Sequence, residues 1–575
     1  MASQETQDLY WVPEERPGGQ RQRGVNGNSG GYCDRTGIYR SLLHLAPHHR
    51  PPPHLHTAEF VLSHFPHPDH AHASFALVDS ALDRCLTYAD LRRSVRSLAA
   101  ALHHGLGVRK GDVVLLLAPN SYLYPPTCLA LLSLGAVLTT ANPLLTAAEV
   151  AKQARDSAAK LVVCSPDLRH KLRDLFDAPL LLTHRDAAED SVVSVEELME
   201  GGEPSEAPAP EIRRSDTAAV LYSSGTTGAN KGCVLTHGNL VAIVNLLRWT
   251  AATKTLARPG DVFLAFLPMF HVYGLAFFAL GLFATGATVV TMPRFDFDAM
   301  LSAVEKYGVT NLPSVPPVVL ALVKRDATAR YDLSTLRRVG CGAAPLSGEV
   351  AEGFRAKFPW VQLRQGYGLT ETAGAATFFP SAEESRSRPS SAGVLFPGFE
   401  ARVVEVGTGA AMPPGREGEL WLRSDTVMKC YLGNEEATAG AIDSEGWLRT
   451  GDLGYFDEQG YLYVVDRIKE LIKHNGYQVA PAELEALLLT HPDVLDAAVV
   501  PEEAEDVGQI PVAFVVRAAD SQLTGKQVIQ FVAEQVAPFK KVKKVSFISS
   551  IPRSAAGKIL RKELIAQVKR SASKL

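Results

Sequence analysis

The chain has 575 residues, too many for a single hydrophobic core, and this length predicts roughly three to four domain-sized units. The hydrophobic fraction of 46% and the formal net charge of -4 are typical of a globular protein. They give no electrostatic reason to expect nucleic acid or an acidic membrane as the main partner. The seven cysteines include no C-x-x-C pair, which favours a reducing compartment over a disulfide framework or a zinc ribbon.

Residues 1–36 are rich in Gly, Gln, Arg and Asn, a composition that predicts a disordered tail without a secretion signal. Gly27-Asn28-Ser29-Gly30-Gly31 matches the G-x-S-x-G nucleophile elbow, but no strand precedes the serine and no helix follows it, which argues against a hydrolase. Nine of the seventeen histidines lie between His44 and His72, among prolines. A metal site is one interpretation of this segment, and a solvated, proline-broken loop is the one we favour.

Helical and strand patterns alternate from about residue 75 to 300. The pattern predicts helices at Leu86–Leu106 and Tyr124–Leu134 and buried strands at Asp112–Ala118 and Ala136–Thr140. Such alternation is typical of parallel α/β layers, so the fold class is α/β. The uncharged stretch between Asp261 and Arg294 is interrupted by proline and glycine, which favours a buried helix and strand over a membrane span.

The last hundred residues predict a small α+β domain. Its expected elements are helices at Pro481–Leu489 and Gly525–Glu534 and strands at Ala497–Val500 and Val512–Val516. The chain ends in Ser573-Lys574-Leu575, the tripeptide that the peroxisomal import receptor reads. We therefore expect that receptor as a partner and the peroxisome as the location.

The strongest chemical signal is the loop Tyr222–Gly232, which follows the apolar run Thr217–Leu221. Its glycines let backbone N–H groups turn inward, its hydroxyls donate further hydrogen bonds, and Lys231 adds a compact positive charge. It is not a Walker A loop, because Asn230 stands where that pattern needs glycine. The loop predicts a phosphate site, with an ordinary flexible turn as the alternative.

Three further clusters carry groups suited to a nucleotide. In Gln365–Glu371, Tyr367 is flanked by glycines and can lie flat against a purine, while Glu371 can address a phosphate-bound Mg²⁺. Gly446–Asp452 ends in an acid able to accept hydrogen bonds from ribose hydroxyls. Arg553–Arg561 places Lys558 on a loop of small residues, where its ammonium group can move.

In this order, from about Thr57 to Arg561, the motifs resemble the adenylate-forming superfamily, and within it the branch of 4-coumarate:CoA ligase and firefly luciferase. The resemblance implies a large N-terminal domain of layered sheets and helices at 37–466, a small mobile C-terminal domain at 467–572, and a hinge near Arg467–Lys469. It also implies two half-reactions. A carboxylate attacks the α-phosphate of ATP to give acyl-AMP and pyrophosphate, and a CoA thiol then displaces AMP.

The resemblance implies a role for each matching residue. Lys558 supplies positive charge at the reacting phosphorus, and His271 lies beside the carboxylate. The remaining implied catalytic residues are Lys473 and Gln478, and Asn475 and Gly476 lie on the CoA side. Glu371 is the implied Mg²⁺ ligand. The implied ATP and AMP contacts are Ser223, Ser224, Gly225, Thr226, Thr227, Gly228, Lys231, Gln365, Gly366, Tyr367, Gly368, Thr370, Asp452 and Arg467.

The implied acyl pocket differs from that of plant coumarate ligases. Small residues replace larger or more polar ones, which favours a longer apolar acyl chain and leaves a phenolic hydroxyl without a partner. We expect a fatty acid or a cyclic oxylipin acid resembling a jasmonate precursor. The pocket residues are Tyr273, Ala276, Gly340, Gly342, Ala343, Gly366, Gly374, Ala375 and Ala376.

Three alternatives remain open at this stage. One is a hydroxycinnamate:CoA ligase. Another is an adenylating enzyme with a different acceptor, because Asn475 replaces the lysine of the family's Lys-Tyr-Lys-Gly. The third is a non-catalytic nucleotide-binding protein, against which Lys558, Glu371 and Asp452 argue.

Overall fold

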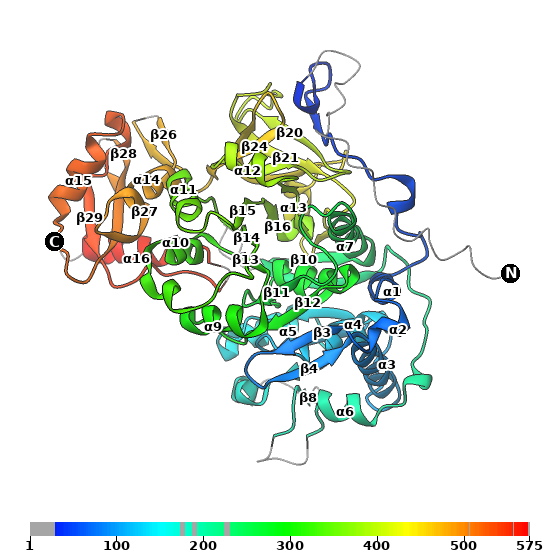
Figure 1. Ribbon diagram of the computed structural model, residues 1–575. Helices are drawn as coiled ribbons and strands as arrows, with labels where there is room; N and C mark the ends of the chain where they lie inside the picture. The colour runs from blue at the N-terminus through cyan, green and yellow to red at the C-terminus, as the bar shows by residue number, and fades with distance from the viewer. Residues whose placement is uncertain are drawn as a thin grey trace.

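The computed structural model describes residues 29–172, 179–186, 192–223, 231–475, 477–504, 507–555 and 557–572. Most of the predicted phosphate loop, residues 224–230, lies outside these ranges, as do Gly476 and the C-terminal tripeptide. The described chain divides into a large N-terminal domain and a small C-terminal domain, which lies to the left in Figure 1.

Two sheets of mainly parallel strands form the centre of the large domain (Figure 1). They carry the strands that lead to the phosphate loop and to the Gln365–Glu371 cluster. The first has the order β22 (Cys430–Tyr431), β10 (Lys231–Thr236), β9 (Thr217–Ser223), β6 (Val137–Thr140), β5 (Val113–Leu117), β7 (Leu161–Cys164), β8 (Leu180–Leu182). The second has the order β15 (Gln362–Gln365), β14 (Arg338–Cys341), β13 (Asn311–Ser314), β11 (Val262–Ala265), β12 (Thr288–Thr291), β3 (Phe75–Asp79), β4 (Arg84–Thr87).

Helices connect and cover these strands, as the alternating sequence pattern predicts. Two expected helices are confirmed as α3 (Tyr88–His104) and α4 (Tyr124–Ser133), and two expected strands as β5 and β6. Thr87 and Asp90 form a capping box that fixes where α3 begins. The other helices of the large domain are α5 (Ala147–Asp156), α6 (Val195–Gly201), α7 (His237–Ala252), α9 (Phe297–Tyr307), α10 (Pro316–Lys324), α11 (Gly348–Lys357), α12 (Ala382–Ser387) and α13 (Glu435–Ala441).

A third, antiparallel sheet completes the large domain and corrects one prediction. Residues 29–36 were expected to be disordered, but Tyr32 and Cys33 form β1 and pair with Tyr39 and Ile38 of β2. The ring of Tyr39 is buried and stacks on Phe456 at 4.6 Å, which anchors this segment. The sheet has the order β1 (Tyr32–Cys33), β2 (Ile38–Arg40), β20 (Glu400–Val404), β21 (Gly418–Arg423), β23 (Leu448–Phe456), β24 (Tyr461–Arg467), β19 (Gly393–Leu395), β18 (Thr377–Phe378).

The histidine-rich segment is also more ordered than predicted. It contains the helices α1 (Thr57–Ser63) and α2 (Pro68–Ala71), so a continuous proline-broken loop was the wrong expectation. Phe60 and Val61 between the histidines are fully buried, and their burial holds α1 against the core. Within the described ranges, no three His, Cys, Asp or Glu side chains are grouped so that they could hold a metal ion.

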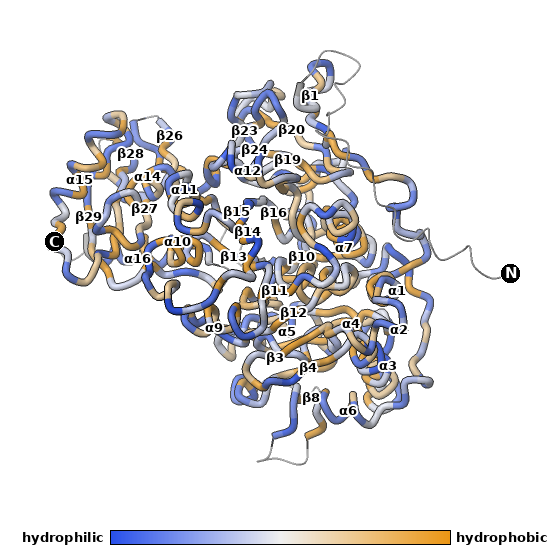
Figure 2. Tube along the Cα trace, viewed as in Figure 1, coloured by the Kyte–Doolittle hydropathy of each residue, from blue (hydrophilic) through white to orange (hydrophobic). Residues whose placement is uncertain are grey.

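The uncharged stretch between Asp261 and Arg294 is buried, as expected. It forms β11, the short helix α8 (Val272–Gly274), the π-helical turn η5 (Leu275–Leu280), the 3₁₀ turn η6 (Gly281–Thr285) and β12. Among the described residues, no helix combines the length and the apolar character that a membrane crossing needs. Figure 2 shows hydrophobic chain around α4 and β12 in the interior, and hydrophilic chain along many outer loops.

The small domain has its own sheet and its own core, built around Ile472, Leu484 and Val499. Its helices are α14 (Pro481–Thr490), α15 (Gly525–Ala533) and α16 (Arg561–Ala572). Figure 1 places it beside α10 and α11, and the Lys324 ammonium of α10 donates a hydrogen bond to the Val494 carbonyl oxygen of β27. The sheet has the order β26 (Tyr477–Val479), β25 (Ile472–His474), β28 (Gly508–Arg517), β27 (Val494–Ala504), and β29 (Lys544–Phe547) pairs with β28.

Candidate active site

The predicted phosphate loop connects β9 to β10. Thr217–Ser223 runs as a strand into the loop, and Lys231 is the first residue of the returning strand, directly opposite Ser223 in the register. Lys231 is half-buried. The predicted phosphate contacts at Ser224, Gly225, Thr226, Thr227 and Gly228 fall outside the described residues.

A tyrosine, an acid and an arginine from three separate motifs meet in the large domain. The Tyr367 hydroxyl donates a hydrogen bond to Asp452 Oδ2 at 2.6 Å, and Arg467 Nε lies 3.4 Å from Asp452 Oδ1. Asp452 and Arg467 are direct partners across β23 and β24, so the sheet register sets their separation. Burial raises the pKa of Asp452, and the nearby Arg467 opposes that rise.

The other predicted residues of this cluster surround Tyr367 and are held by the backbone. The Gln365 amide donates to the Pro389 carbonyl oxygen at 2.5 Å, and the Gly366 N–H donates to the Cys341 carbonyl oxygen at 3.1 Å. A Cβ on Gly368 would lie 2.1 Å from the Gly374 carbonyl oxygen, so only glycine fits where β16 (Gly368–Leu369) pairs with β17 (Gly374–Ala375). Thr370 is buried and begins the 3₁₀ turn η8 (Thr370–Thr372).

Glu371 lies in that turn and is joined to Lys231 through a residue that the sequence analysis missed. The Tyr431 hydroxyl donates to Glu371 Oε1 at 2.8 Å, and the Lys231 ammonium lies 5.0 Å from the centre of the Tyr431 ring. The sequence analysis did not single out Tyr431, because it belongs to none of the recognised motifs. In the structure it lies in β22, a strand of two residues. The contact becomes visible only when β22 is seen to pair with β10.

Lys558 enters the site from the small domain on a tight loop. The Gly557 N–H donates to the Ser554 carbonyl oxygen at 2.8 Å, and the Ser554 N–H donates to the Lys558 carbonyl oxygen at 2.7 Å. Burial lowers the pKa of Lys558, and Arg467 acts in the same direction, whereas Asp452 and Glu371 favour the charged ammonium. Lys558 is therefore close enough to Asp452, Arg467 and Glu371 to interact with their charges.

His271 is the residue directly before α8, and it lies near Lys558. Its Nδ1 accepts a hydrogen bond from the Tyr273 N–H at 3.4 Å and so caps the start of the helix. Burial, and secondarily the charge of Lys558, lowers the pKa of His271 to about 4. The imidazole is therefore neutral near pH 7.

The residues predicted for the acyl pocket divide into two groups. A Cβ on Gly342 would lie 3.7 Å from both Tyr273 Cε1 and the Gly366 carbonyl oxygen, and a Cβ on Gly374 would lie 3.0 Å from Ile243. These residues therefore gather beside His271 and α7, and Gly340 and Ala343 lie on the neighbouring chain at and after β14. Ala276 and Ala376 instead belong to the buried core, and Ala375 is exposed.

Phe277 was not considered in the sequence analysis. It is half-buried, and its ring centre lies 5.9 Å from that of Tyr273, edge to face. The bulky ring stands directly after Ala276, in a π-helical turn, an irregularity often found at functional sites. The prediction that Ala276 leaves the acyl pocket with less side-chain volume therefore did not take the adjacent ring of Phe277 into account.

The remaining predicted residues of the small domain lie apart from this cluster. Lys473 and Gln478 face each other across β25 and β26, and both are exposed. Within the described chain, no hydrogen bond or ion pair joins either side chain to Lys558, Asp452 or Glu371. Asn475 between them has a φ of 49°, a left-handed conformation that Asn adopts more readily than Lys.

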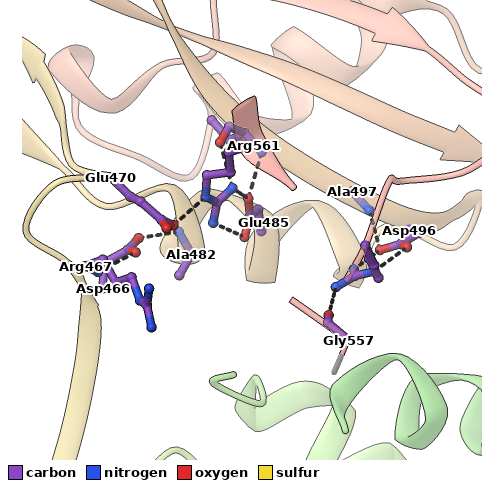
Figure 3. A network of polar contacts seen from close by, with 11 residues as sticks. Asp466, Arg467, Glu470, Ala482, Glu485, Asp496, Ala497, Gly557 and Arg561 are labelled. Atoms are coloured by element: carbon purple, nitrogen blue, oxygen red, sulfur yellow. Dashed lines mark hydrogen bonds and ion pairs between the residues drawn. The ribbon is translucent and has the colours of Figure 1, made fainter. Parts of the chain in front are cut away.

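A polar network ties the connection between the domains to the base of the Lys558 loop (Figure 3). The Arg561 guanidinium contacts Glu470 Oε2 at 2.7 Å and the carboxylate of Glu485 on α14. Asp466, at the end of β24, accepts a hydrogen bond from the Ala482 N–H of α14 at 2.9 Å. Burial raises the pKa of Asp466 to about 6.

Comparison with known proteins places this geometry in a family. Residues 67–432 match the AMP-binding enzyme family, and residues 483–558 match the AMP-binding enzyme C-terminal domain. The chain is 46% identical over 562 residues to a protein of Arabidopsis thaliana named peroxisomal OPC-8:0-CoA ligase 1, covering 96% of this chain and 100% of that protein. It is also 46% identical over 549 residues to a protein of Humulus lupulus named probable CoA ligase CCL5, covering 93% and 96%.

A solved structure shows the same fold. ATP-bound MatB from Rhodopseudomonas palustris superposes with a TM-score of 0.78 at 28% sequence identity, covering 89% of this chain and 99% of that one. The chain belongs to the AMP-binding enzyme family and has the adenylate-forming fold, with its large N-terminal and small C-terminal domains. Within that family it is an AMP-forming acid–CoA ligase.

Proposed function

We propose that the enzyme activates a long apolar carboxylic acid, a fatty acid or a cyclic oxylipin acid, in two half-reactions. A carboxylate oxygen attacks the α-phosphorus of ATP, pyrophosphate leaves, and acyl-AMP remains. The sulfur of CoA then attacks the acyl carbon, and AMP leaves with the bonding electrons. The observation that carries this proposal is that Asp452, held by Tyr367 and Arg467, and Glu371, held by Tyr431, both interact with the buried Lys558, which in turn acts on a neutral His271.

Lys558 is the proposed catalytic cation of the first half-reaction. Two anions must approach each other there, so a fixed positive charge at the developing pentacoordinate phosphorus lowers the barrier. Asp452 and Glu371 favour the charged form of this lysine. A neutral His271 can make a polar contact with the carboxylate of the acid substrate. A charged imidazolium would instead form an ion pair with that carboxylate and make its oxygen a weaker nucleophile.

The nucleotide is proposed to lie between the phosphate loop and Tyr367. The ring of Tyr367 is held against Asp452 by its own hydroxyl, and Asp452, steadied by Arg467, is placed to accept hydrogen bonds from the ribose. The loop residues, with Lys231 and Thr370, are proposed to hold the phosphates, while Gln365, Gly366 and Gly368 shape the wall beside Tyr367.

Glu371 fits the proposed Mg²⁺ site. Mg²⁺ in nucleotide sites commonly takes one or two carboxylates together with phosphate oxygens. Among the described residues, Tyr431 is the hydrogen-bond partner of this carboxylate, through Oε1, which leaves Oε2 for a metal. When bound, the ion would neutralise charge on the triphosphate.

The second half-reaction is proposed to use the hairpin of Lys473, Asn475, Gly476 and Gln478. Its exposed position implies that the small domain turns about Arg467–Lys469 to bring the hairpin to the acyl-AMP. An adenylating enzyme with another acceptor stays the alternative, because Asn475 occupies the place of a lysine. AMP release measured with and without CoA separates the two.

The acid is proposed from the pocket and from one relative. We propose that the glycines at 342 and 374 line the acyl pocket together with the rings of Tyr273 and Phe277, which are in edge-to-face contact. The Arabidopsis relative is named for OPC-8:0, and its name places it in peroxisomes. We propose the peroxisome for this protein too, because it is 46% identical to that relative over 96% of its own length.

ATP–pyrophosphate exchange tests the substrate proposal. The purified enzyme is offered fatty acids, oxylipin acids, 4-coumarate and caffeate side by side, and we expect exchange with the long apolar acids. Exchange that is fastest with a hydroxycinnamate would refute the pocket assignment and leave the chemistry standing. For location, a fluorescent protein fused to the N-terminus should enter peroxisomes, and one fused to the C-terminus should stay in the cytosol.

A further inference from the structure

Tyr431 lies on β22, next to both the proposed phosphate-binding residue Lys231 and the proposed metal ligand Glu371. It is the direct partner of Cys233 in β10, the strand that begins with Lys231. The Leu432 N–H donates to the Gly232 carbonyl oxygen at 2.7 Å, and the Lys429 N–H donates to the Val234 carbonyl oxygen at 2.9 Å. The backbone on either side of Tyr431 is therefore fixed to the strand that leaves the phosphate loop.

The same short segment also holds Glu371 twice. The Met428 N–H donates to the Glu371 carbonyl oxygen at 2.8 Å, and the Tyr431 hydroxyl donates to the Glu371 carboxylate at the same distance. Backbone and side chain of the acid are thus both restrained. A hydrogen bond to a charged group is stronger than one between neutral groups, so it fixes the rotation of the carboxylate.

The ring of Tyr431 faces Lys231. The ammonium lies 5.0 Å from the ring centre, within the range of a cation–π contact. One side chain therefore contacts an anion through its hydroxyl and a cation through its face.

We propose that Tyr431 is a positioning residue that sets Glu371 and Lys231 at a fixed separation, so that the site for a metal-bound triphosphate is formed before ATP arrives. The inference rests on the proposed function, because it assigns Glu371 to the metal and Lys231 to the phosphates. Side chains that orient a metal ligand commonly change metal affinity about 10- to 100-fold when they are removed.

Calorimetry of ATP binding without an acid tests the hydroxyl, because no reaction occurs under those conditions. ATP is titrated once with Mg²⁺ and once with EDTA, and the ratio of the two affinities gives the gain that Mg²⁺ provides. We expect Tyr431→Phe to reduce this gain about tenfold and to leave ATP affinity in EDTA unchanged. Tyr455→Phe, which removes a tyrosine hydroxyl from a stacked pair with Tyr463, is the matched control and should behave as wild type.

A second variant separates the ring from the hydroxyl. Tyr431→Leu removes both contacts, so it should also weaken ATP binding in EDTA. Neither variant should slow thioester formation from supplied acyl-AMP, because that step contains no triphosphate, whereas general damage to the fold would slow it.

The possible failures are distinguishable. A Tyr431→Phe protein that gains as much ATP affinity from Mg²⁺ as wild type overturns the positioning role. Equal loss of ATP binding and thioester formation in Tyr431→Phe also overturns it. Failure of the proposed function would instead appear in the wild type, as an absence of ATP binding.

Discussion

Gly557, next to Lys558 in the small domain, packs directly against Val315 of the large domain. A Cβ on Gly557 would lie 3.0 Å from Val315 Cγ2, and the φ of Gly557 is +82°. Glycine is therefore required here both by backbone conformation and by the closeness of the two domains. The contact holds the lysine loop in place at the site.

Gly557→Ala should slow adenylation about tenfold or more, because a left-handed alanine costs roughly 1–2 kcal/mol and its methyl group pushes the loop away from Val315. Thioester formation from supplied acyl-AMP should change little. Adding Val315→Ala to this variant should restore part of the rate by making room. Gly111→Ala, at φ +86° with no atom within 4 Å of the new Cβ, is the control for backbone strain alone. No recovery in the double variant would contradict the packing explanation.

Lys558→Ala should nearly abolish ATP–pyrophosphate exchange and leave thioester formation from acyl-AMP largely intact, since only the first step builds new negative charge at phosphorus. The loss of one well-placed charge corresponds to about 3–4 kcal/mol, or a few hundredfold in rate. Lys562→Ala, an exposed lysine on α16, is the matched control. Equal loss of both half-reactions would show that Lys558 has another role.

His271 should stay neutral throughout the working pH range. Burial and the Lys558 charge disfavour the imidazolium, so the pKa of His271 falls from 6.5 to about 4 on folding. Its contribution to stability is therefore complete above pH 6.5 and is lost as the pH falls towards 4. The NMR signal of His271, assigned by its absence in His271→Gln, should not titrate between pH 8 and 5.5. In Lys558→Ala its pKa should be higher, and an unchanged pKa would argue against the proximity of the two residues.

The catalytic efficiency kcat/KM should rise with chain length among aliphatic and oxylipin acids and exceed that for 4-coumarate. Each buried methylene contributes about 0.8 kcal/mol, so three more raise kcat/KM roughly fiftyfold if they stay buried in the transition state. Gly342→Ala places a methyl group in ordinary contact with Tyr273, at 3.7 Å, and should lower kcat/KM for long acids more than for short ones. An equal effect on all lengths would move Gly342 out of the acyl pocket.

The sequence predicted most of the elements because local patterns decide them. Thr87 and Asp90 mark the start of α3, and the apolar run of Val113–Leu117 identifies a buried strand. The sequence did not predict α1, because the many histidines and prolines around it obscure the helical pattern of its buried residues, which include Phe60 and Val61. It also failed at Tyr32, because β1 is stabilised by pairing with β2 and by the third sheet rather than by its own composition.

For the site, the sequence identified residue types but could not determine their separation. Lys558 and Asp452 come from motifs that the resemblance put in order, and their meeting depends on how the two domains pack. Tyr431 had no motif of its own, and only the register between β22 and β10 reveals it. The buried positions of Ala276 and Ala376 likewise follow from tertiary packing that no local pattern records.

In the hydrogen bond from the Ala482 N–H to Asp466, a residue of the large domain caps a helix of the small domain. The N-cap residue of α14, Ala480, has no side chain that could cap the helix, and Asp466 from the end of β24 takes that role. Any turn of the small domain about Arg467–Lys469 that separates the two leaves the first turn of α14 uncapped, at a cost of about 1 kcal/mol. The capped orientation of the small domain is therefore lower in free energy than orientations in which Asp466 and Ala482 are separated, so rotation about Arg467–Lys469 is not free.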